Sequence, residues 1–258
     1  LGVGRPLGDA NIAEAVAAAK SAETAILFVG RTGEWDTEGS DLTSIAMPGR
    51  QNELISAVAK VNPRTIVVLQ TGGPVKMPWI DEVAAVLQAW YPGQEVGNAI
   101  ADVLTGGAEP GGGLPQSFPV RWADNPTHSQ DPEVYPGLEG RVRYEEGVFI
   151  GYRHYDRTGI APLFPFGHGL SYTSFALSDL SVDDSRFEND GAVSVSVTVA
   201  NTGKRAGSEV VQLYVSDDEA RDPGPKKELK PFAEVALAPG QNKRVELTLD
   251  ARAFAYFR

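Results

Sequence analysis

The fold of the first half of the chain is decided by two stretches, AILFVG at residues 25–30 and TIVVLQT at residues 65–71. Both are continuous apolar runs of strand length, without the polar alternation of a strand that has one face in water. Each follows a segment with helical spacing of its apolar residues, NIAEAVAAAKSA at 11–22 and RQNELISAVAKV at 50–61. Strands that are buried on both faces and alternate with helices are typical of a parallel sheet flanked by helices. The pattern therefore predicts a layered α/β domain.

The same alternation continues downstream. A third apolar run, AAVLQAW at residues 84–90, precedes a helical segment, QEVGNAIADVL at 94–104, and a shorter strand is expected within residues 114–120. Residues 122–146 are polar, rich in Pro and Gly, and show no periodicity. A loop of this length either serves a site or is ordered by a partner.

The second half of the chain switches to β-strand patterning. Residues 193–199, VSVSVTV, alternate Val with Ser or Thr, which predicts a half-buried strand. Two further strands are expected at VVQLYVS, residues 210–216, and at RVELTL, residues 244–249, with turn-forming groups between them. The chain is therefore predicted to form an α/β domain over residues 1–165 and a small antiparallel β-sandwich over residues 171–258.

Composition excludes several classes of function. The chain has 258 residues, with 34 acidic against 23 basic side chains and a net charge of −11, which argues against nucleic-acid binding. Cysteine is absent, so disulfides and thiolate nucleophiles are excluded. No apolar run approaches the roughly 18 to 20 residues of a membrane span, so a soluble protein without membrane contact is expected.

Motifs for metal, cofactor and serine chemistry are missing as well. His128, His154 and His168 are not spaced as paired zinc ligands, and the Gly-x-Ser-x-Gly elbow is absent. The Gly-rich residues 106–113 follow a helical segment, the reverse of the order that places glycines at a helix N-terminus under a dinucleotide. Neither a metal nor an organic cofactor is therefore expected.

Carboxylates are densest directly after the first predicted strand, in GRTGEWDTEGSD at residues 30–41. The loop carries four of them beside one indole: Glu34, Asp36, Glu38, Asp41 and Trp35. Ligand crevices of open α/β sheets form at the carboxyl ends of strands, and carboxylates there are suited to proton transfer. An indole can also lie against a sugar ring, so carbohydrate chemistry is favoured over phosphate chemistry. The alternatives are a solvated acidic loop and a Trp35 that only packs within it.

Other tryptophans and tyrosines have simpler interpretations. Trp79, Trp90 and Tyr91 lie in or beside apolar runs, so we expect them in the core.

Six segments resemble, in order, the second and third domains of glycoside hydrolase family 3 β-glucosidases. Four are similar to the second domain: GEWDTEGSDLTSIAMPGRQNEL at 33–54, NPRTIVVLQTGGPVKMPW at 62–79, AWYPGQEVGNAIADVLTGGAEPGGGLPQSFP at 89–119, and GYRHYDRTGIAPLFPFGHGLSYTSF at 151–175. Two are similar to the C-terminal domain: VVQLYV at 210–215 and KELKPF at 227–232. The resemblance covers nearly the whole chain. It implies a three-layer α/β/α sandwich followed by an all-β fibronectin type III-like sandwich.

The same resemblance implies a retaining mechanism on terminal β-D-glucosyl residues. In that mechanism a nucleophilic Asp on an N-terminal TIM-like barrel attacks the anomeric carbon, and the second domain supplies the general acid/base. Relatives with this loop type carry the acid/base in a Glu-Gly-x-Asp string, which matches residues 38–41 here. Glu38 is therefore the expected acid/base, Glu34 is the second candidate, and Trp35 is a candidate for binding the substrate. Relatives often have Arg after that Asp, whereas this chain has Leu42, so no role of that Arg carries over.

Two departures from the family pattern bear on function. Nothing in the chain resembles the barrel, so we expect the chain to serve a barrel carried elsewhere and to be inactive alone. The chain also ends at Arg258, where relatives continue through further strands, so the sandwich is expected to be incomplete with an exposed edge. The rival interpretation is a non-catalytic carbohydrate-binding or scaffold module derived from the same fold. Sequence leaves the oligomeric state and the compartment open.

Overall fold

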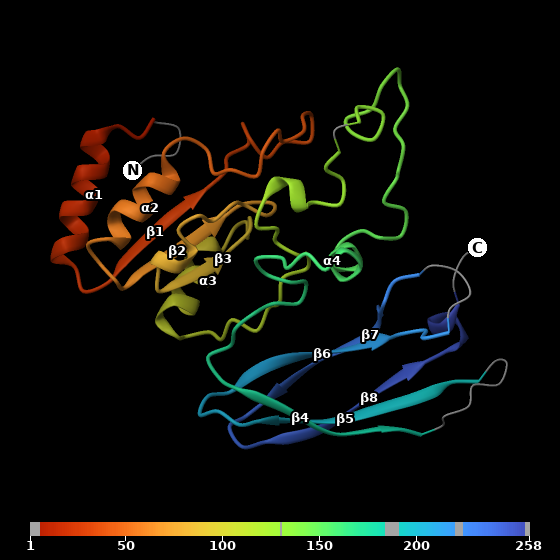
Figure 1. Ribbon diagram of the computed structural model, residues 1–258. Helices are drawn as coiled ribbons and strands as arrows, with labels where there is room; N and C mark the ends of the chain where they lie inside the picture. The colour runs from red at the N-terminus through yellow and green to blue at the C-terminus, as the bar shows by residue number, and fades with distance from the viewer. Residues whose placement is uncertain (1–5, 130, 184–190, 220–223, 256–258) are drawn as a thin grey trace. The chain divides into compact units, whose positions relative to one another are not determined.

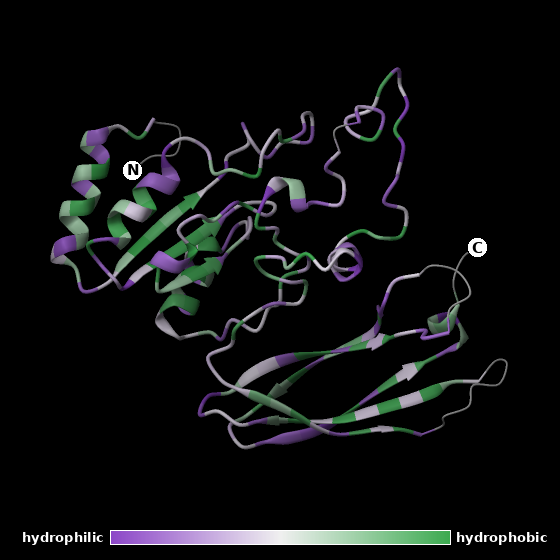
Figure 2. Cartoon of the chain, viewed as in Figure 1, coloured by the Kyte–Doolittle hydropathy of each residue, from purple (hydrophilic) through white to green (hydrophobic). Residues whose placement is uncertain are grey.

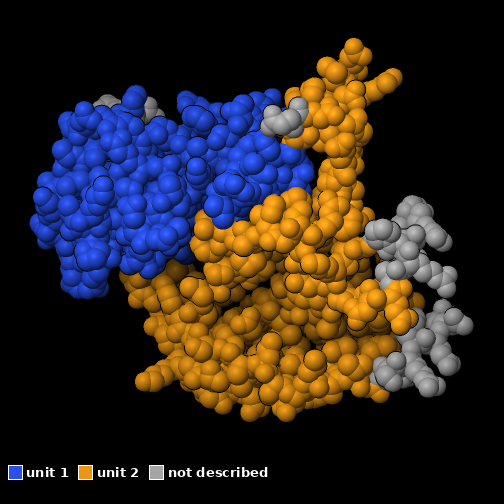
Figure 3. All heavy atoms as spheres, viewed as in Figure 1, with its two compact units in different colours: residues 1–100, 118–128 blue, residues 101–117, 129–258 orange. Residues whose placement is uncertain are grey.

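The computed structural model describes residues 6–129, 131–183, 191–219 and 224–255 (Figure 1). Contacts between residues divide the chain into two compact units (Figure 3). Unit 1 comprises residues 1–100 and 118–128, and unit 2 comprises residues 101–117 and 129–258.

Unit 1 is built on a parallel sheet of three strands. Strands β1 (Ala25–Gly30), β2 (Thr65–Gln70) and β3 (Ala85–Gln88) lie in the order β1-β2-β3, and both pairs are parallel. Figure 2 shows hydrophobic residues running along these strands without alternation. Because the strands are parallel, their carboxyl ends lie at the same edge of the sheet. The predicted α/β class is confirmed.

Two helices cover one face of this sheet. Helices α1 (Asp9–Ser21) and α2 (Gln51–Ala59) share a buried cluster with β1, made by Ile12, Ala19, Ala25, Leu54 and Val58. The alternate residues of β1, Ile26 and Phe28, point to the other face and are exposed. Besides β3, the regular elements between the end of β2 and residue 128 are η1 (Ile80–Glu82), α3 (Val96–Thr105) and η2 (Trp122–Asp124).

Residues 114–120 do not form the expected strand. The Leu114 amide donates to the carbonyl oxygen of His168 at 2.8 Å, and the Gly167 amide donates to the carbonyl oxygen of Leu114 at 2.7 Å. A Cβ on Gly113 would lie 2.8 Å from the Gly167 carbonyl oxygen, so glycine permits this approach of two backbones. The segment therefore pairs with a loop rather than with a sheet.

Unit 2 contains an antiparallel β-sandwich, as predicted. Strands β4 (Phe175–Val182), β5 (Val193–Asn201) and β8 (Asn242–Leu249) form one sheet in the order β4-β5-β8, and β6 (Gly207–Val215) pairs with β7 (Glu228–Leu237). Figure 2 shows the alternation along β5, whose valines are buried. They pack with residues of both sheets, namely Val197, Val199, Val211, Val235, Leu237, Val245 and Leu247. The short η3 (Ala251–Phe254) follows β8.

A short helix is fastened to this sandwich. The hydroxyl of Tyr152, in α4 (Tyr152–Thr158), accepts a hydrogen bond from the Leu229 amide of β7 at 2.8 Å, and Arg153 forms an ion pair with Glu228 at 3.0 Å. These contacts place α4 in unit 2. The domain limits at residues 1–165 and 171–258 stay a prediction, since contacts within one chain do not define an evolutionary domain.

The polar segment before α4 has little regular structure. Over residues 129–150 the described part shows one isolated bridge, between Leu138 and Arg141. An exposed ion-pair cluster crosses it, in which Arg143 contacts three carboxylates at 2.7 Å: Asp131, Glu133 and Glu145. Figure 3 shows this segment protruding from the body of unit 2.

We expect Gly30→Ala to lower the free energy of unfolding of unit 1 by about 1 to 3 kcal/mol, the usual cost of overpacking. A Cβ on Gly30 would clash with the carbonyl oxygen of Gln70 on β2. It would also disturb the Gln51 side chain, which hydrogen-bonds both the amide and the carbonyl of Gly30, at 2.8 and 2.9 Å. Urea unfolding followed by tryptophan fluorescence measures the effect, since the four tryptophans lie in unit 1.

Gly97→Ala is the matched control. Apart from its chain neighbours and the nearby backbone of α3, no atom of the described residues lies within 4 Å of a Cβ at Gly97, so alanine should stabilise the helix by roughly 0.5 to 1 kcal/mol. Equal effects of the two substitutions would contradict the packing argument.

Candidate active site

The acidic loop joins the carboxyl end of β1 to α2 and spans residues 31–49 (Figure 1). An isolated antiparallel bridge between Thr37 and Ser40 closes a tight turn within it. Glu38 and Gly39 occupy the tip of that turn, and both are exposed. The Glu38 carboxylate is therefore exposed at the edge of the sheet where the strands end.

One carboxylate of the loop turns inward. Asp36 Oδ2 accepts hydrogen bonds from the Tyr91 hydroxyl at 2.6 Å and from the Gly72 amide at 2.9 Å. Asp36 Oδ1 lies 3.4 Å from Nη1 of Arg31, and only 13% of the Asp36 side chain is exposed. These four residues, Arg31, Asp36, Gly72 and Tyr91, form the Asp36 cluster.

The three partners of Asp36 come from the ends of three different strands. Arg31 follows β1 directly, Gly72 follows β2, and Tyr91 follows β3. Glycine leaves room for the two side chains at the second position, because a Cβ on Gly72 would lie 3.1 Å from the Tyr91 ring and 3.2 Å from Asp36 Oδ2. The parallel topology therefore brings the cluster together at the sheet edge where ligands of α/β proteins bind.

Arg31 supplies the positive charge of the cluster from a buried position. Its side chain is 1% exposed, and its Nη2 lies 3.4 Å from the carbonyl oxygen of Ala46, at the far end of the loop. The Arg31 amide continues the β1–β2 ladder by donating to the Gln70 carbonyl oxygen at 3.0 Å. A buried guanidinium needs a counter-charge, and Asp36 provides it.

Charge states in the cluster follow from these contacts. Burial raises the pKa of Asp36, but the hydrogen bonds from Tyr91 and Gly72 and the charge of Arg31 outweigh burial and lower that pKa below its ordinary value. Burial and the hydrogen bond to Asp36 raise the pKa of Tyr91 to about 12. At neutral pH Asp36 is therefore an anion and Tyr91 a neutral donor.

The residues predicted to act on a substrate lie outside this cluster. Glu38 and Glu34 are exposed, and in the described part of the chain no hydrogen bond or ion pair is formed by either carboxylate. Trp35 is 45% exposed beside them. The loop thus holds one carboxylate in place and leaves two free in water. The roles of Glu38, Glu34 and Trp35 stay predictions.

Two family models match most of the chain. The glycosyl hydrolase family 3 C-terminal domain matches residues 5–172, and a fibronectin type III-like domain matches residues 209–258.

The chain belongs to glycosyl hydrolase family 3.

Relatives of this family 3 chain are β-glucosidases of greater length. It is 55% identical over 256 residues to a β-glucosidase of Rhizobium radiobacter, covering 99% of this chain and 31% of the relative. It is 50% identical over 246 residues to thermostable β-glucosidase B of Acetivibrio thermocellus, covering 95% of this chain and 32% of the relative. The chain therefore spans about a third of the length of these relatives and corresponds to their C-terminal part.

Solved structures show the same fold. DesR, a β-glucosidase from Streptomyces venezuelae solved in complex with D-glucose, superposes with a TM-score of 0.88 at 46% identity, covering 95% of this chain and 30% of DesR. A family 3 β-glucosidase of Bifidobacterium adolescentis superposes with a TM-score of 0.92 at 38% identity, covering 99% of this chain and 37% of that enzyme. The expected α/β domain with a fibronectin type III-like domain is confirmed.

Sequence reasoning missed the contacts of two residues in this family 3 chain. Asp36 counted only as one of four acids, and Tyr91 was expected in the core. The core expectation is wrong for Tyr91, which is 50% exposed and uses its hydroxyl in the Asp36 cluster. It is correct for Trp79, which is fully buried with its indole N–H donating to Asn52 Oδ1 at 2.8 Å. The position of Tyr91 just after a predicted strand was the signal that could have placed it at the edge of the sheet.

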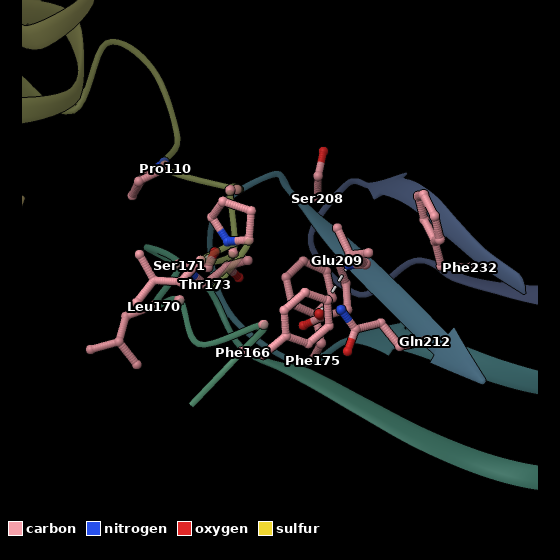
Figure 4. A pocket seen from close by; sticks show the side chains of 18 of the residues that line it. Pro110, Phe166, Leu170, Ser171, Thr173, Phe175, Ser208, Glu209, Gln212 and Phe232 are labelled. Carbon is pink, nitrogen blue, oxygen red and sulfur yellow. Dashed lines mark hydrogen bonds between the residues drawn. The ribbon is translucent and has the colours of Figure 1, made fainter. Parts of the chain in front are cut away.

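A groove of about 760 Å³ lies elsewhere, in unit 2. Residues 110–115, 166–175 and 208–212 form most of its lining. Figure 4 labels Phe166 and Phe175 among the residues that line it. None of the predicted site residues lines this groove.

The described ranges contain no group of three or more His, Cys, Asp or Glu side chains that could hold a metal ion. No helix in these ranges has both the length and the hydropathy needed to span a membrane.

Asp36→Asn should destabilise unit 1 by about 1.5 to 3 kcal/mol at neutral pH, the range for hydrogen bonds to a charged group. The pKa of Asp36 is lower in the folded than in the unfolded chain, so its carboxylate stabilises the fold above the unfolded pKa, near 3.9. That stabilisation is lost as the pH falls through the lower, folded pKa. The free energies of unfolding of wild type and variant should therefore differ constantly from about pH 5 to 7 and converge below about pH 4.

The exposed Glu34→Gln variant is the control and should match wild type across this range. A gap between wild type and Asp36→Asn that persists unchanged at low pH would contradict an ionised Asp36.

Proposed function

We propose that this chain is the acid/base-bearing part of a retaining β-glucosidase and that Glu38 is its general acid/base. The observation that carries the proposal is the Glu-Gly-x-Asp string on an exposed turn at the carboxyl end of β1, tethered two residues earlier by Asp36. A loop that only solvates the surface has no need for a buried ionic tether. The names of the relatives, β-glucosidases, support the same reaction class.

The reaction needs a second carboxylate from outside this chain. In the first step that nucleophile attacks the anomeric carbon while the bond to the leaving oxygen breaks, and the Glu38 carboxylic acid gives its proton to that oxygen. In the second step a water attacks the anomeric carbon, the bond to the nucleophile breaks, and the Glu38 carboxylate takes the proton of the water. Glu38 thus ends each cycle protonated, as it began.

The position of Glu38 suits this role. In retaining glycosidases the two carboxyl groups are about 5 to 5.5 Å apart, so the acid/base must reach the nucleophile across the junction of two parts of the protein. An exposed turn tip can do so, whereas a carboxylate turned inward like Asp36 cannot. Trp35, half exposed three residues before Glu38, is proposed to lie against the sugar ring or its aglycone.

The proposed substrate is a terminal β-D-glucosyl residue of a glucoside or oligosaccharide. Support comes from the relatives, which are β-glucosidases, and from D-glucose in the DesR complex. The part that would carry the nucleophile is proposed to be the N-terminal, barrel-like portion of the full-length protein.

In the full-length protein, Glu38→Ala should lower kcat/KM by about 100- to 10,000-fold for alkyl β-glucosides, because an alcohol leaves only with a proton. For 2,4-dinitrophenyl β-glucoside the loss should be small, since that phenolate departs unprotonated. Added azide should raise kcat for the activated substrate and give a β-glycosyl azide, since azide attacks without base catalysis. Steady-state kinetics and product analysis measure these effects.

Glu34→Ala is the parallel variant and should show neither the leaving-group dependence nor the azide rescue. The opposite pattern, with Glu34→Ala impaired in this way and Glu38→Ala normal, would assign the acid/base to Glu34.

The isolated 258-residue chain should show no turnover of an aryl β-glucoside, because it lacks the nucleophile. The full-length protein is the positive control, and circular dichroism of the chain establishes that it is folded. Turnover that one of the chain's own residues abolishes on mutation would refute a nucleophile located elsewhere.

A further inference from the structure

We propose that Asp36 is a positioning residue for the acid/base, which holds the turn that carries Glu38 against the ends of all three strands. This inference rests on the proposed function of Glu38 and concerns how the same site is kept in working geometry. Asp36 itself touches no reacting atom in this proposal.

The contacts of the loop single out Asp36. Within the described chain, Asp36 is the only residue from Thr32 to Ser44 that hydrogen-bonds to another segment, through Gly72 and Tyr91. The next such bond is made by the carbonyl oxygen of Ile45, which accepts from the Lys76 amide at 2.8 Å. Asp36 thus divides a long unsupported loop into two shorter ones.

Burial along the loop supports this division. Residues 33–35 and 37–41 are all exposed, whereas the Asp36 side chain is 13% exposed. Exposed residues without contacts to other segments contribute little order to a loop. One residue, Thr37, separates Asp36 from Glu38, so the place of Asp36 limits directly where the Glu38 backbone can go.

Electrostatics make the tether strong. The Tyr91 hydroxyl donates to an anion at 2.6 Å, and hydrogen bonds to charged groups are about twice as strong as neutral ones. Arg31, buried beneath the loop, loses its counter-charge if Asp36 is neutralised. Neutralising Asp36 therefore loosens the loop and also leaves a buried cation unpaired, whereas removing the Tyr91 hydroxyl only loosens the loop.

A small displacement of Glu38 has a specific kinetic result. Proton transfer requires hydrogen-bond distance to the leaving oxygen, and a misplacement of about 1 Å can cost about 100-fold in rate. Only steps that need this proton suffer. A misplaced acid/base should therefore give a weakened form of the Glu38→Ala behaviour.

The test compares Asp36→Asn and Tyr91→Phe in the full-length protein with alkyl and 2,4-dinitrophenyl β-glucosides. We expect kcat/KM for the alkyl substrate to fall by about 10- to 100-fold in Asp36→Asn, and by less in Tyr91→Phe, which keeps the Gly72 and Arg31 contacts. For the dinitrophenyl substrate kcat/KM should change little, and azide should raise kcat. Should Asp36→Asn fail to fold, Tyr91→Phe still carries the test.

A double variant separates positioning from general stability. In Glu38→Ala/Asp36→Asn the second substitution should cause no further loss with the alkyl substrate, because no acid remains to be positioned. Asp124→Asn is the matched control. Asp124 is also a buried aspartate paired with an arginine, Arg121 at 2.6 Å, and its loss should lower stability without leaving-group dependence.

Three results would overturn the inference. Equal losses with both substrates in Asp36→Asn and Tyr91→Phe, or a loss from Asp36→Asn that adds in full to that of Glu38→Ala, would reduce Asp36 to a structural residue while Glu38 keeps its role. A Glu38→Ala variant without leaving-group dependence would overturn the proposed function and, with it, this inference.

Discussion

The ionic hydrogen-bond cluster around Asp36 is the interaction on which the candidate site depends. A parallel sheet brings the ends of its strands to one edge, but the loops that leave them are separate segments of chain. Asp36 joins these segments by accepting from Gly72 after β2 and Tyr91 after β3 while pairing with Arg31 after β1. These contacts fix part of the loop against the ends of the strands, although its other residues are mostly exposed.

The proposed reaction requires an ordered loop, because its two carboxylates come from different parts of the protein. An acid/base and a nucleophile that come from different parts of a protein must still be held about 5 to 5.5 Å apart. In the proposed reaction Glu38 points outward for that purpose, and its carboxylate forms no hydrogen bond or ion pair with the described residues. Under this proposal its position must be fixed through the neighbouring backbone, which Asp36 holds. The two carboxylates, two residues apart, have opposite requirements: one must be buried and ionised, the other accessible.

Much of the fold could be predicted from local patterns, because the spacing of apolar residues along a strand indicates which of its faces are buried. The continuous apolar runs at residues 25–30 and 65–71 became β1 and β2 of a parallel sheet, and the alternating valines of residues 193–199 became β5 of the sandwich. The expected strand at residues 114–120 failed for a reason that no local pattern contains. Its backbone meets the loop around Gly167, where glycines allow two chains to approach closely.

Sequence patterns were enough to predict the α/β and β-sandwich classes, the acidic loop after the first strand and, through resemblance, the candidate Glu38. They could not predict which carboxylate of that loop turns inward, because four acids within eight residues are equivalent until a partner is placed beside one of them. That partner, Tyr91, is 55 residues from Asp36 along the chain, and the Gly72 amide is 36 residues away. Parallel pairing of β1, β2 and β3 brings these residues close together, and Asp36 pairs with the buried charge of Arg31.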